Sequence, residues 1–203
     1  MDQDSGLRER LIDVGVELVT TEGTAALGLR EIARRAGVSH GAPRRYFATH
    51  HALLSAIARR GFEDLGARVP AAISAAAASG DPREQVRALG RAYVGFALER
   101  RGMFELMFRH DLLDSTGQDG PAGSRLRDST LPLFDLLVSL VSRCEAAGSP
   151  RITAAALWAN LHGVAQLWSW GSLALALGSG SRTTAEDCVG ELVDAAVDAH
   201  LRP

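Results

Sequence analysis

Hydrophobic side chains recur along this chain at the spacing of three and four residues that is typical of an α-helix. Leu7, Leu11, Val14 and Leu18 share one face of the first such segment. Ala is abundant and β-branched residues never alternate over a run, so no segment predicts a strand. The predicted fold class is therefore all-α. The expected helices span about 7–21, 29–36, a short segment with residues 44–47, 49 to about 70, 82–100, 103–110, a helix ending near 147, an uncharged helix after residue 151, and 183–201.

Glycine, proline and capping residues mark the expected ends of these helices. Gly37 can close the second helix in the left-handed conformation, and Ser39 can cap the short third one. We expect Pro70 to bend or end the fourth helix, and Pro132 to break the helix that contains it. A Gly-rich loop is expected over 116–124, and Thr183-x-x-Glu186 forms a capping box for the last helix.

The composition excludes several classes of function. Hydrophobic residues make up 46% of the 203 residues and charged residues 23%, which is typical of one large or two small globular domains. All 22 basic residues are arginines, so a Walker-A phosphate loop and Schiff-base chemistry lack their lysine. Cys144 and Cys188 lie far apart, and no signal-peptide pattern opens the chain. We therefore expect a cytoplasmic protein.

One stretch tests that expectation, because residues 152–181 contain no Asp, Glu, Lys or Arg. This is longer than the roughly 20 residues that span a bilayer. Asn160, His162 and Gln166 would then lie near the bilayer centre, where polar groups are costly. The pattern favours a helix buried between protein surfaces over a membrane helix.

Charge is distributed unevenly along the chain. Residues 27–60 hold seven arginines and one acidic residue, Glu31, which gives a net charge of +6. Residues 1–26 and residues 61–203 each carry a net charge of −4. A basic window in an acidic protein is typical of a site for a polyanion.

Within this window, the pattern of residues 29–47 is typical of a helix-turn-helix. Ala33 is small where a second helix must cross closely, Gly37 supplies the turn, and Val38 can fill the core between the helices. Arg44 and Arg45 then face outward, where each can bind guanine or neutralise a phosphate. The alternative is a basic helical hairpin that is only a solvated surface.

The segment Leu29-Arg-Glu-Ile-Ala-Arg-Arg-Ala-Gly-Val-Ser-His-Gly-Ala-Pro-Arg-Arg-Tyr-Phe47, followed by Ala52-Leu53-Leu54, resembles the DNA-binding domain of the TetR family of transcriptional regulators. The resemblance covers about residues 5–65 and places the hairpin at about 28–47. It implies an all-helical homodimer whose N-terminal domain, 5–65, binds a palindromic operator in double-stranded DNA. The remaining residues, 66–203, would hold a small effector and form the dimer.

The resemblance and the basic window together indicate which residues contact DNA. In family members, Tyr usually stands at the position of Arg44 and Lys at that of His50, and both normally touch phosphate. Arg44 can keep such a contact, whereas a histidine is largely neutral at pH 7, which predicts weaker or pH-dependent binding. The candidate DNA-binding residues are Arg30, Ser39, His40, Gly41, Arg44, Arg45, Tyr46 and His50.

The C-terminal part shows a resemblance to one subgroup of the family and a pattern of small residues that predicts a dimer interface. Trp158–Gly163 is similar to the Trp-His-Gly signature of one C-terminal subgroup of the family, and Arg101–Phe108 resembles the same subgroup more loosely. We expect the dimer interface to lie within about 151–201, as a four-helix bundle formed by two helices of each subunit. The alternative is burial of this helix inside one subunit. The interface prediction rests on a ridge of small residues at Ala155, Ala159, Gly163 and Gly171.

A cluster of aromatic and Met side chains with a few polar groups predicts a site for a small, mostly apolar effector. Ordinary core packing is the alternative, and His162 can equally be a core histidine bonded to a carbonyl. No metal site is expected, because the adjacent His50 and His51 point to different sides of a helix and no ligand is placed to join His162. No cofactor is expected either. The candidate effector-binding residues are Tyr93, Phe96, Met103, Phe104, Met107, Trp158 and His162.

Three functions follow from these patterns. The first is a ligand-responsive, dimeric repressor that binds DNA. The second is an enzyme of unknown reaction, for example a hydrolase that uses His110 or His162. It is disfavoured because the chain has no G-x-S-x-G, H-E-x-x-H or G-x-G-x-x-G motif and no catalytic residues can be assigned. The third is a helical interaction module that no longer binds DNA strongly.

Overall fold

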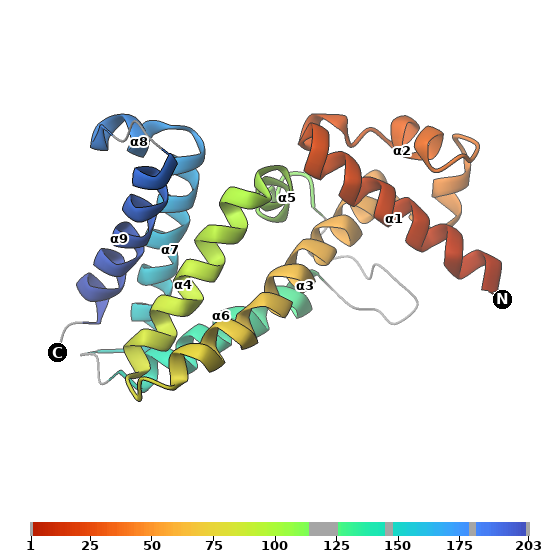
Figure 1. The fold of residues 1–203 in the computed structure, drawn as a ribbon. Helices are drawn as coiled ribbons and strands as arrows, with labels where there is room; N and C mark the ends of the chain where they lie inside the picture. Colours follow the sequence, from red (N-terminus) through yellow and green to blue (C-terminus); the bar gives the residue numbers. More distant parts are fainter. Residues whose placement is uncertain (1, 114–125, 145–147, 179–181, 202–203) are drawn as a thin grey trace. The chain divides into compact units, whose positions relative to one another are not determined.

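The computed structural model describes residues 2–113, 126–144, 148–178 and 182–201 (Figure 1). Across these residues the chain forms nine α-helices and two 3-10 turns, without a strand, so the predicted all-α class is confirmed. The expected loop at 116–124 lies outside the described residues. The elements are α1 (Asp2–Glu22), η1 (Thr24–Ala26), α2 (Leu29–Arg35), η2 (Ala42–Arg45), α3 (His50–Ala77), α4 (Pro82–Glu99), α5 (Arg101–Met107), α6 (Leu126–Ser142), α7 (Pro150–Ser169), α8 (Ser172–Leu177) and α9 (Arg182–His200).

The chain divides into two compact units, and each unit is built from two separate segments. The first unit comprises Met1–Asp64 and Arg100–Thr130, and the second comprises Leu65–Glu99 and Leu131–Pro203. The chain passes between the units inside α3, between α4 and α5, and inside α6. Neither unit is therefore a continuous piece of sequence.

The first unit packs around α1, which contacts both α2 and α5. Glycines let its helices approach closely. A Cβ added to Gly15 would lie 2.2 Å from Ile57 Cδ1 of α3, and one added to Gly102 would lie 2.1 Å from the carbonyl oxygen of Val19. The fully buried core side chains of this unit include Leu11, Leu18, Val19, Ile32, Leu53, Ile57, Met103, Leu106 and Met107.

The second unit packs α4, α7 and α9 against one another. In Figure 1 these three helices, coloured green, light blue and dark blue, run side by side. Ion pairs join α4 to α9: Arg87 bonds to Asp198, and Arg91 lies 2.7 Å from Asp194. The buried core here includes Val86, Val94, Phe96, Leu157, Leu161, Val193 and Val197.

Two prolines lie inside helices, so Pro70 does not end its helix and the break predicted at Pro132 is wrong. Helix α3 continues through Pro70 to Ala77, and α6 contains Pro132. A proline inside a helix removes one backbone hydrogen bond, while the alanines that follow Pro70 are the strongest helix formers. The Ala-rich segment therefore remains helical.

The uncharged stretch is divided into two helices at Gly171. Helix α7 ends at Ser169, Gly171 adopts the left-handed conformation with φ 78°, and the short α8 follows. Gly171 therefore does not lie on a ridge with Ala155, Ala159 and Gly163, and that part of the prediction was wrong. Among the described residues, no helix has the length and apolar character needed to cross a membrane.

Candidate functional site

The backbone of residues 28–47 forms a hairpin of α2 and η2, so the short helix predicted to carry residues 44–47 is a 3-10 turn that ends at Arg45. Helix α2 begins after Gly28, whose carbonyl accepts the Ile32 N–H at 3.0 Å. Gly37 has φ 67°, in the left-handed region that favours glycine, and ends the helix as expected. The Val38 N–H then donates to the carbonyl of Ala33 at 3.0 Å, which turns the chain sharply.

The segment that carries Arg44 and Arg45 is a single 3-10 turn, η2, preceded by Gly41. The sequence predicted that the Ser39 side chain caps this segment, but it does not. The turn begins at Ala42, so its N-cap residue is Gly41. Instead, the main-chain carbonyl of Ser39 accepts the Ala42 N–H at 3.0 Å. Pro43 and Phe47 are buried and anchor the turn, so Arg44 and Arg45 between them are exposed.

Two of the hairpin arginines are bound by carboxylates. Glu31 accepts hydrogen bonds from Arg34 at 2.6 Å and from Arg35 at 2.8 Å, and Glu22 lies 2.5 Å from Arg35. The hydrogen bonds from Arg34 and then Arg35 lower the pKa of Glu31 from 4.5 to about 2. Carboxylates therefore neutralise the guanidinium groups of Arg34 and Arg35, and the Arg35–Glu22 pair also joins α2 to α1.

Three other arginines of this region, Arg30, Arg44 and Arg45, are exposed. In the described part of the chain, none of the three has an acidic partner within ion-pair distance. The neighbouring Ser39, His40 and Gly41 are exposed in the turn as well. The hairpin thus presents guanidinium groups whose charge is not neutralised by the protein, which suits an anionic partner.

The remaining two predicted residues are half-buried. Tyr46 follows η2 and donates its backbone N–H to the Pro43 carbonyl at 3.0 Å. His50, the first residue of α3, places its ring Nε2 2.6 Å from the carbonyl oxygen of Leu27. Next to it, the Thr49 hydroxyl accepts the Ala52 N–H at 3.0 Å and caps α3.

The structure does not bring all seven predicted effector residues into one unit. Met103, Phe104 and Met107 belong to the first unit and are buried there. A Cβ on Gly61 would lie 2.7 Å from the sulfur atoms of both methionines, so α3 and α5 pack closely at this point. The other four residues, Tyr93, Phe96, Trp158 and His162, belong to the second unit.

Three of those four residues form a chain of hydrogen bonds between α4 and α7. The Trp158 Nε1–H donates to the Tyr93 oxygen at 3.1 Å, and the Tyr93 oxygen lies 2.8 Å from His162 Nδ1. Burial lowers the pKa of His162 and raises that of Tyr93, so both side chains are neutral at pH 7. The Tyr93 hydroxyl can then donate to the neutral imidazole. Trp158 is 40% exposed, so this polar group opens toward the surface.

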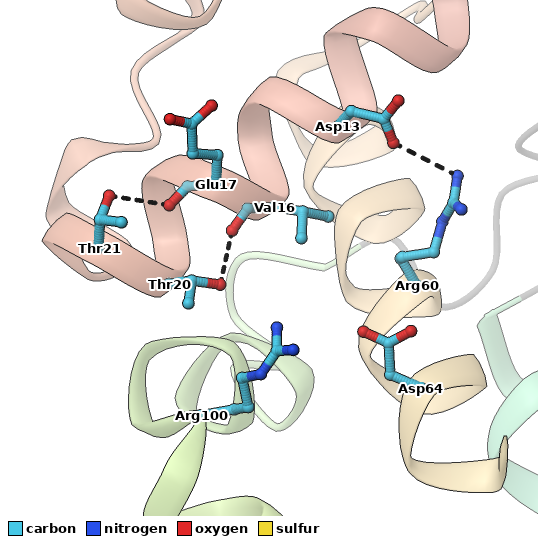
Figure 2. A pocket seen from close by; sticks show the side chains of 8 residues that line it. All are labelled: Asp13, Val16, Glu17, Thr20, Thr21, Arg60, Asp64 and Arg100. Carbon is cyan, nitrogen blue, oxygen red and sulfur yellow. Dashed lines mark hydrogen bonds and ion pairs between the residues drawn. The ribbon is translucent and has the colours of Figure 1, made fainter. Parts of the chain in front are cut away.

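The first unit contains an open hollow of about 410 Å³ that the sequence did not reveal. Figure 2 shows Asp13 pointing toward Arg60, 3.7 Å away, while Thr20 and Thr21 bond back to their own helix. Its lining is mostly charged and polar, unlike the apolar lining of a typical effector site. The lining residues are Asp13, Val16, Glu17, Thr20, Thr21, Arg60, Asp64 and Arg100. Among the described residues, no group of three or more His, Cys, Asp or Glu could hold a metal ion.

Two family models match the chain. The model "Bacterial regulatory proteins, tetR family" matches residues 11–57, which contain the hairpin. The model "Tetracyclin repressor-like, C-terminal domain" matches residues 86–199, which is more than half of the chain.

Individual relatives show the same similarity. The chain is 38% identical over 84 residues to the HTH-type transcriptional regulator BetI of Rhizobium meliloti (strain 1021), and the match spans 41% of this chain and 40% of that relative. A protein of unknown function from Rhodococcus sp. RHA1 is 30% identical, with a TM-score of 0.72 over 97% of this chain and 94% of its own. A TetR-family transcriptional regulator from Streptomyces coelicolor shares the fold at 20% identity, with a TM-score of 0.63 over 98% and 95% of the two chains.

Proposed function

Because the chain belongs to the TetR family of bacterial regulatory proteins, we propose that it is a dimeric repressor that binds operator DNA and releases it when a small effector binds. In this proposal residues 5–65 bind DNA and residues 66–203 hold the effector and form the dimer. The observation that carries it is the hairpin with three exposed arginines that lack acidic partners in the described part of the chain. The protein would act in the cytoplasm, where its operator lies.

The hairpin supports a division of labour among the DNA-binding residues. Arg44 and Arg45 on η2 would enter the major groove, where an arginine can bind guanine through two hydrogen bonds. Arg30 at the start of α2 would contact phosphate, which fixes the position of the protein without reading sequence. Two hairpins related by a dyad would bind a palindrome whose half-sites lie about one helical turn apart.

An exposed apolar stripe along α7 supports dimerisation within the predicted range 151–201. Ile152, Leu167 and Trp170 are 70%, 41% and 71% exposed, and Ala159 lies between them on the same side of α7. Several exposed apolar side chains on one side of a helix are typical of an interaction site in soluble proteins. A Cβ on Gly163 would meet nothing within 4 Å, which leaves room for a helix of a second subunit. Two such helices from each subunit would form a four-helix bundle.

The hydrogen-bonded group of Tyr93, Trp158 and His162 supports an effector site in the second unit. It supplies polar partners beside aromatic surface, since the Phe134 and Trp158 rings lie 6.1 Å apart. A small, mostly apolar molecule that makes one or two hydrogen bonds suits such a lining. Met103, Phe104 and Met107 fill the core of the first unit, so this proposal does not depend on them. Membership of the Trp-His-Gly subgroup remains a proposal based on Trp158–Gly163.

The experiment that tests the function is selection of duplexes from a random DNA pool by the full-length protein, followed by footprinting. We expect a palindromic site whose affinity falls steeply with salt, because phosphate contacts release counterions. A protein that selects no sequence and shows no salt-dependent binding would contradict the proposal.

Release can then be tested by screening small molecules for displacement of that operator. We expect an inducer to bind more weakly to the Tyr93→Phe and Trp158→Phe variants. Both variants should still fold and bind the operator. Leu175→Ala, an exposed position on α8, is the control and should leave displacement unchanged. If the inducer displaces the operator equally well from both aromatic variants, the effector site lies elsewhere.

A further inference from the structure

We propose that His50 is a positioning residue for DNA binding, which holds the start of α2, and Arg30 with it, against the start of α3. The imidazole Nε2–H donates to the carbonyl oxygen of Leu27 at 2.6 Å, a short hydrogen bond. This inference rests on the proposed function, since Arg30 and the hairpin must bind DNA for their placement to matter. It gives His50 a role other than the phosphate contact that the sequence had suggested.

The hydrogen bond joins two helix starts that are far apart in the sequence. Leu27 is 3% exposed and immediately precedes Gly28, the residue that caps α2. His50 is the first residue of α3, whose cap is Thr49. The bond therefore fixes the chain that enters α2 to the first turn of α3.

Helix α2 needs such an external restraint at its start. It has only seven residues, and Gly28 offers no side chain to cap it. A short helix is marginal on its own and depends on contacts outside itself. The ion pair between Arg35 and Glu22 holds its last turn to α1, so the His50–Leu27 bond supplies the matching external restraint at the other end.

The same geometry argues against a direct phosphate contact by the ring. Nε2 is the imidazole nitrogen farther from the main chain, and here it is hydrogen-bonded to the Leu27 carbonyl oxygen. The other nitrogen, Nδ1, is bonded to Cγ, so it lies closer to the main chain and extends less far toward a phosphate. A lysine at this position would instead carry a mobile ammonium on a long stem, which suits a phosphate. Arg30, exposed and three residues after Leu27, is the charged group that the bond places.

A double-mutant cycle on operator affinity tests the coupling, with wild type, His50→Leu, Arg30→Ala and the double variant. Loss of one hydrogen bond predicts roughly fivefold to tenfold weaker binding for His50→Leu. Because His50 acts through Arg30, the double variant should bind within about twofold of Arg30→Ala. Losses that multiply, or an Arg30→Ala variant as tight as wild type, would overturn the proposal.

Two further variants separate positioning from a general loss of folding. His50→Gln keeps an N–H donor at similar reach and should restore affinity to within about twofold of wild type, whereas His50→Asn is too short and should not. His51→Leu, at the exposed next position, is the matched control and should bind as wild type does. Rescue by His50→Lys but not by His50→Gln would instead indicate a direct phosphate contact and overturn the positioning role.

The hydrogen bond itself can be measured without DNA. Nitrogen-15 NMR of the histidine rings in the free full-length protein should show His50 with its proton on Nε2, and a ring protonated only on Nδ1 would overturn the proposal. A wild-type protein that selects no duplex contradicts the proposed function. A wild type that selects an operator but is indifferent to His50→Leu contradicts only the inference about His50.

Discussion

At the scale of single residues, the role of each hairpin arginine depends on whether a carboxylate lies within reach. Arg34 and Arg35 share Glu31, and Arg35 also pairs with Glu22. Such exposed pairs contribute little to stability individually, but they fix the direction of both guanidinium groups. Arg44 and Arg45 have no such partner in the described part of the chain, so their charge remains available for DNA.

Replacing Arg44 and Arg45 with Ala should therefore weaken operator binding. A side chain that reads a base should cost about 1–3 kcal/mol, whereas one that touches phosphate should reduce the salt slope by about 1. Fluorescence anisotropy over a range of salt concentrations measures both quantities. Arg101→Ala, an exposed arginine at the start of α5, is the control. If the double variant binds the operator with unchanged affinity, η2 is not part of the DNA interface.

The carboxylate of Glu31 should make the hairpin sensitive to acid but not to changes near neutrality. Its pKa is about 2 in the folded chain, below the ordinary 4.5, so the ionised form stabilises the fold above pH 4.5. That contribution should disappear as the pH falls from about 4.5 through about 2. Carboxyl NMR titration measures the pKa directly, and a midpoint near 4.5 would contradict the ion pairing.

A complementary measurement compares wild type with Glu31→Gln by urea unfolding. The wild type should be the more stable at pH 7, and the difference should shrink as the pH approaches 2. A difference that stays constant with pH would mean that the carboxylate charge does not matter.

These residue roles could be predicted only where they are local in sequence. The Glu31 pairs with Arg34 and Arg35 follow from the spacing of three and four residues along a helix. The pair with Glu22 and the bond between His50 and Leu27 connect different elements, so they depend on tertiary packing that no spacing encodes. The basic window and the Glu31 pairs are therefore local features of the sequence, whereas the links from Arg35 to α1 and from Leu27 to α3 are not.

At the scale of elements, α5 is a structural part of the first unit. Gly102 lies against the backbone of α1, Glu105 accepts a hydrogen bond from Thr24 at 3.0 Å, and the Phe62 and Phe108 rings meet edge to face with centroids 5.7 Å apart. Helix α5 therefore packs against α1, which itself contacts α2 of the hairpin, although α5 follows the hairpin by more than fifty residues in the sequence.

Substituting Gly102 with Ala should destabilise the protein. The new Cβ would lie 2.1 Å from the Val19 carbonyl oxygen and 3.2 Å from Gly23 Cα, and both of these are backbone atoms that cannot rotate away. Overpacking of this kind costs about 1–3 kcal/mol. Urea unfolding monitored by circular dichroism gives the free energy.

Gly95→Ala provides the matched control, because a Cβ there meets nothing within 4 Å. Since Gly95 lies inside α4, alanine should gain up to about 1 kcal/mol from helix propensity. Equal effects of the two substitutions would mean that α1 and α5 do not approach as closely as the structure indicates.

Helices were predicted well and their ends less well, for identifiable reasons. Apolar spacing locates a helix because it must bury one face, which holds for α4 and α9. The helices continue through Pro70 and Pro132, because packing and neighbouring helix formers outweigh the one hydrogen bond that each proline removes. The left-handed turn at Gly171 was missed because the stretch around it carries no charged residue to mark the end of a helix.

At the scale of the whole molecule, the exposed stripe on α7 should hold two copies together. Ala159→Glu places a charge on this stripe, and a buried charge without a partner should cost about 3 kcal/mol or more of dimerisation free energy. Sedimentation velocity measures the dissociation. Ala71→Glu, the same change at an exposed alanine of α3, should remain dimeric. If the Ala159→Glu protein stays dimeric while folding normally, the interface lies elsewhere.

The position of α5 also limits how genes for such regulators can exchange parts. A crossover just after residue 64 would transfer the hairpin but leave behind Arg101–Met107, and with it the surface that covers Val19 and Gly61. The recipient could keep such a hairpin folded only if its own α5 carried a glycine and flexible side chains at the matching positions. New pairings of operator and effector should therefore arise more readily by point substitution on the hairpin surface than by recombination of the two ends of the gene.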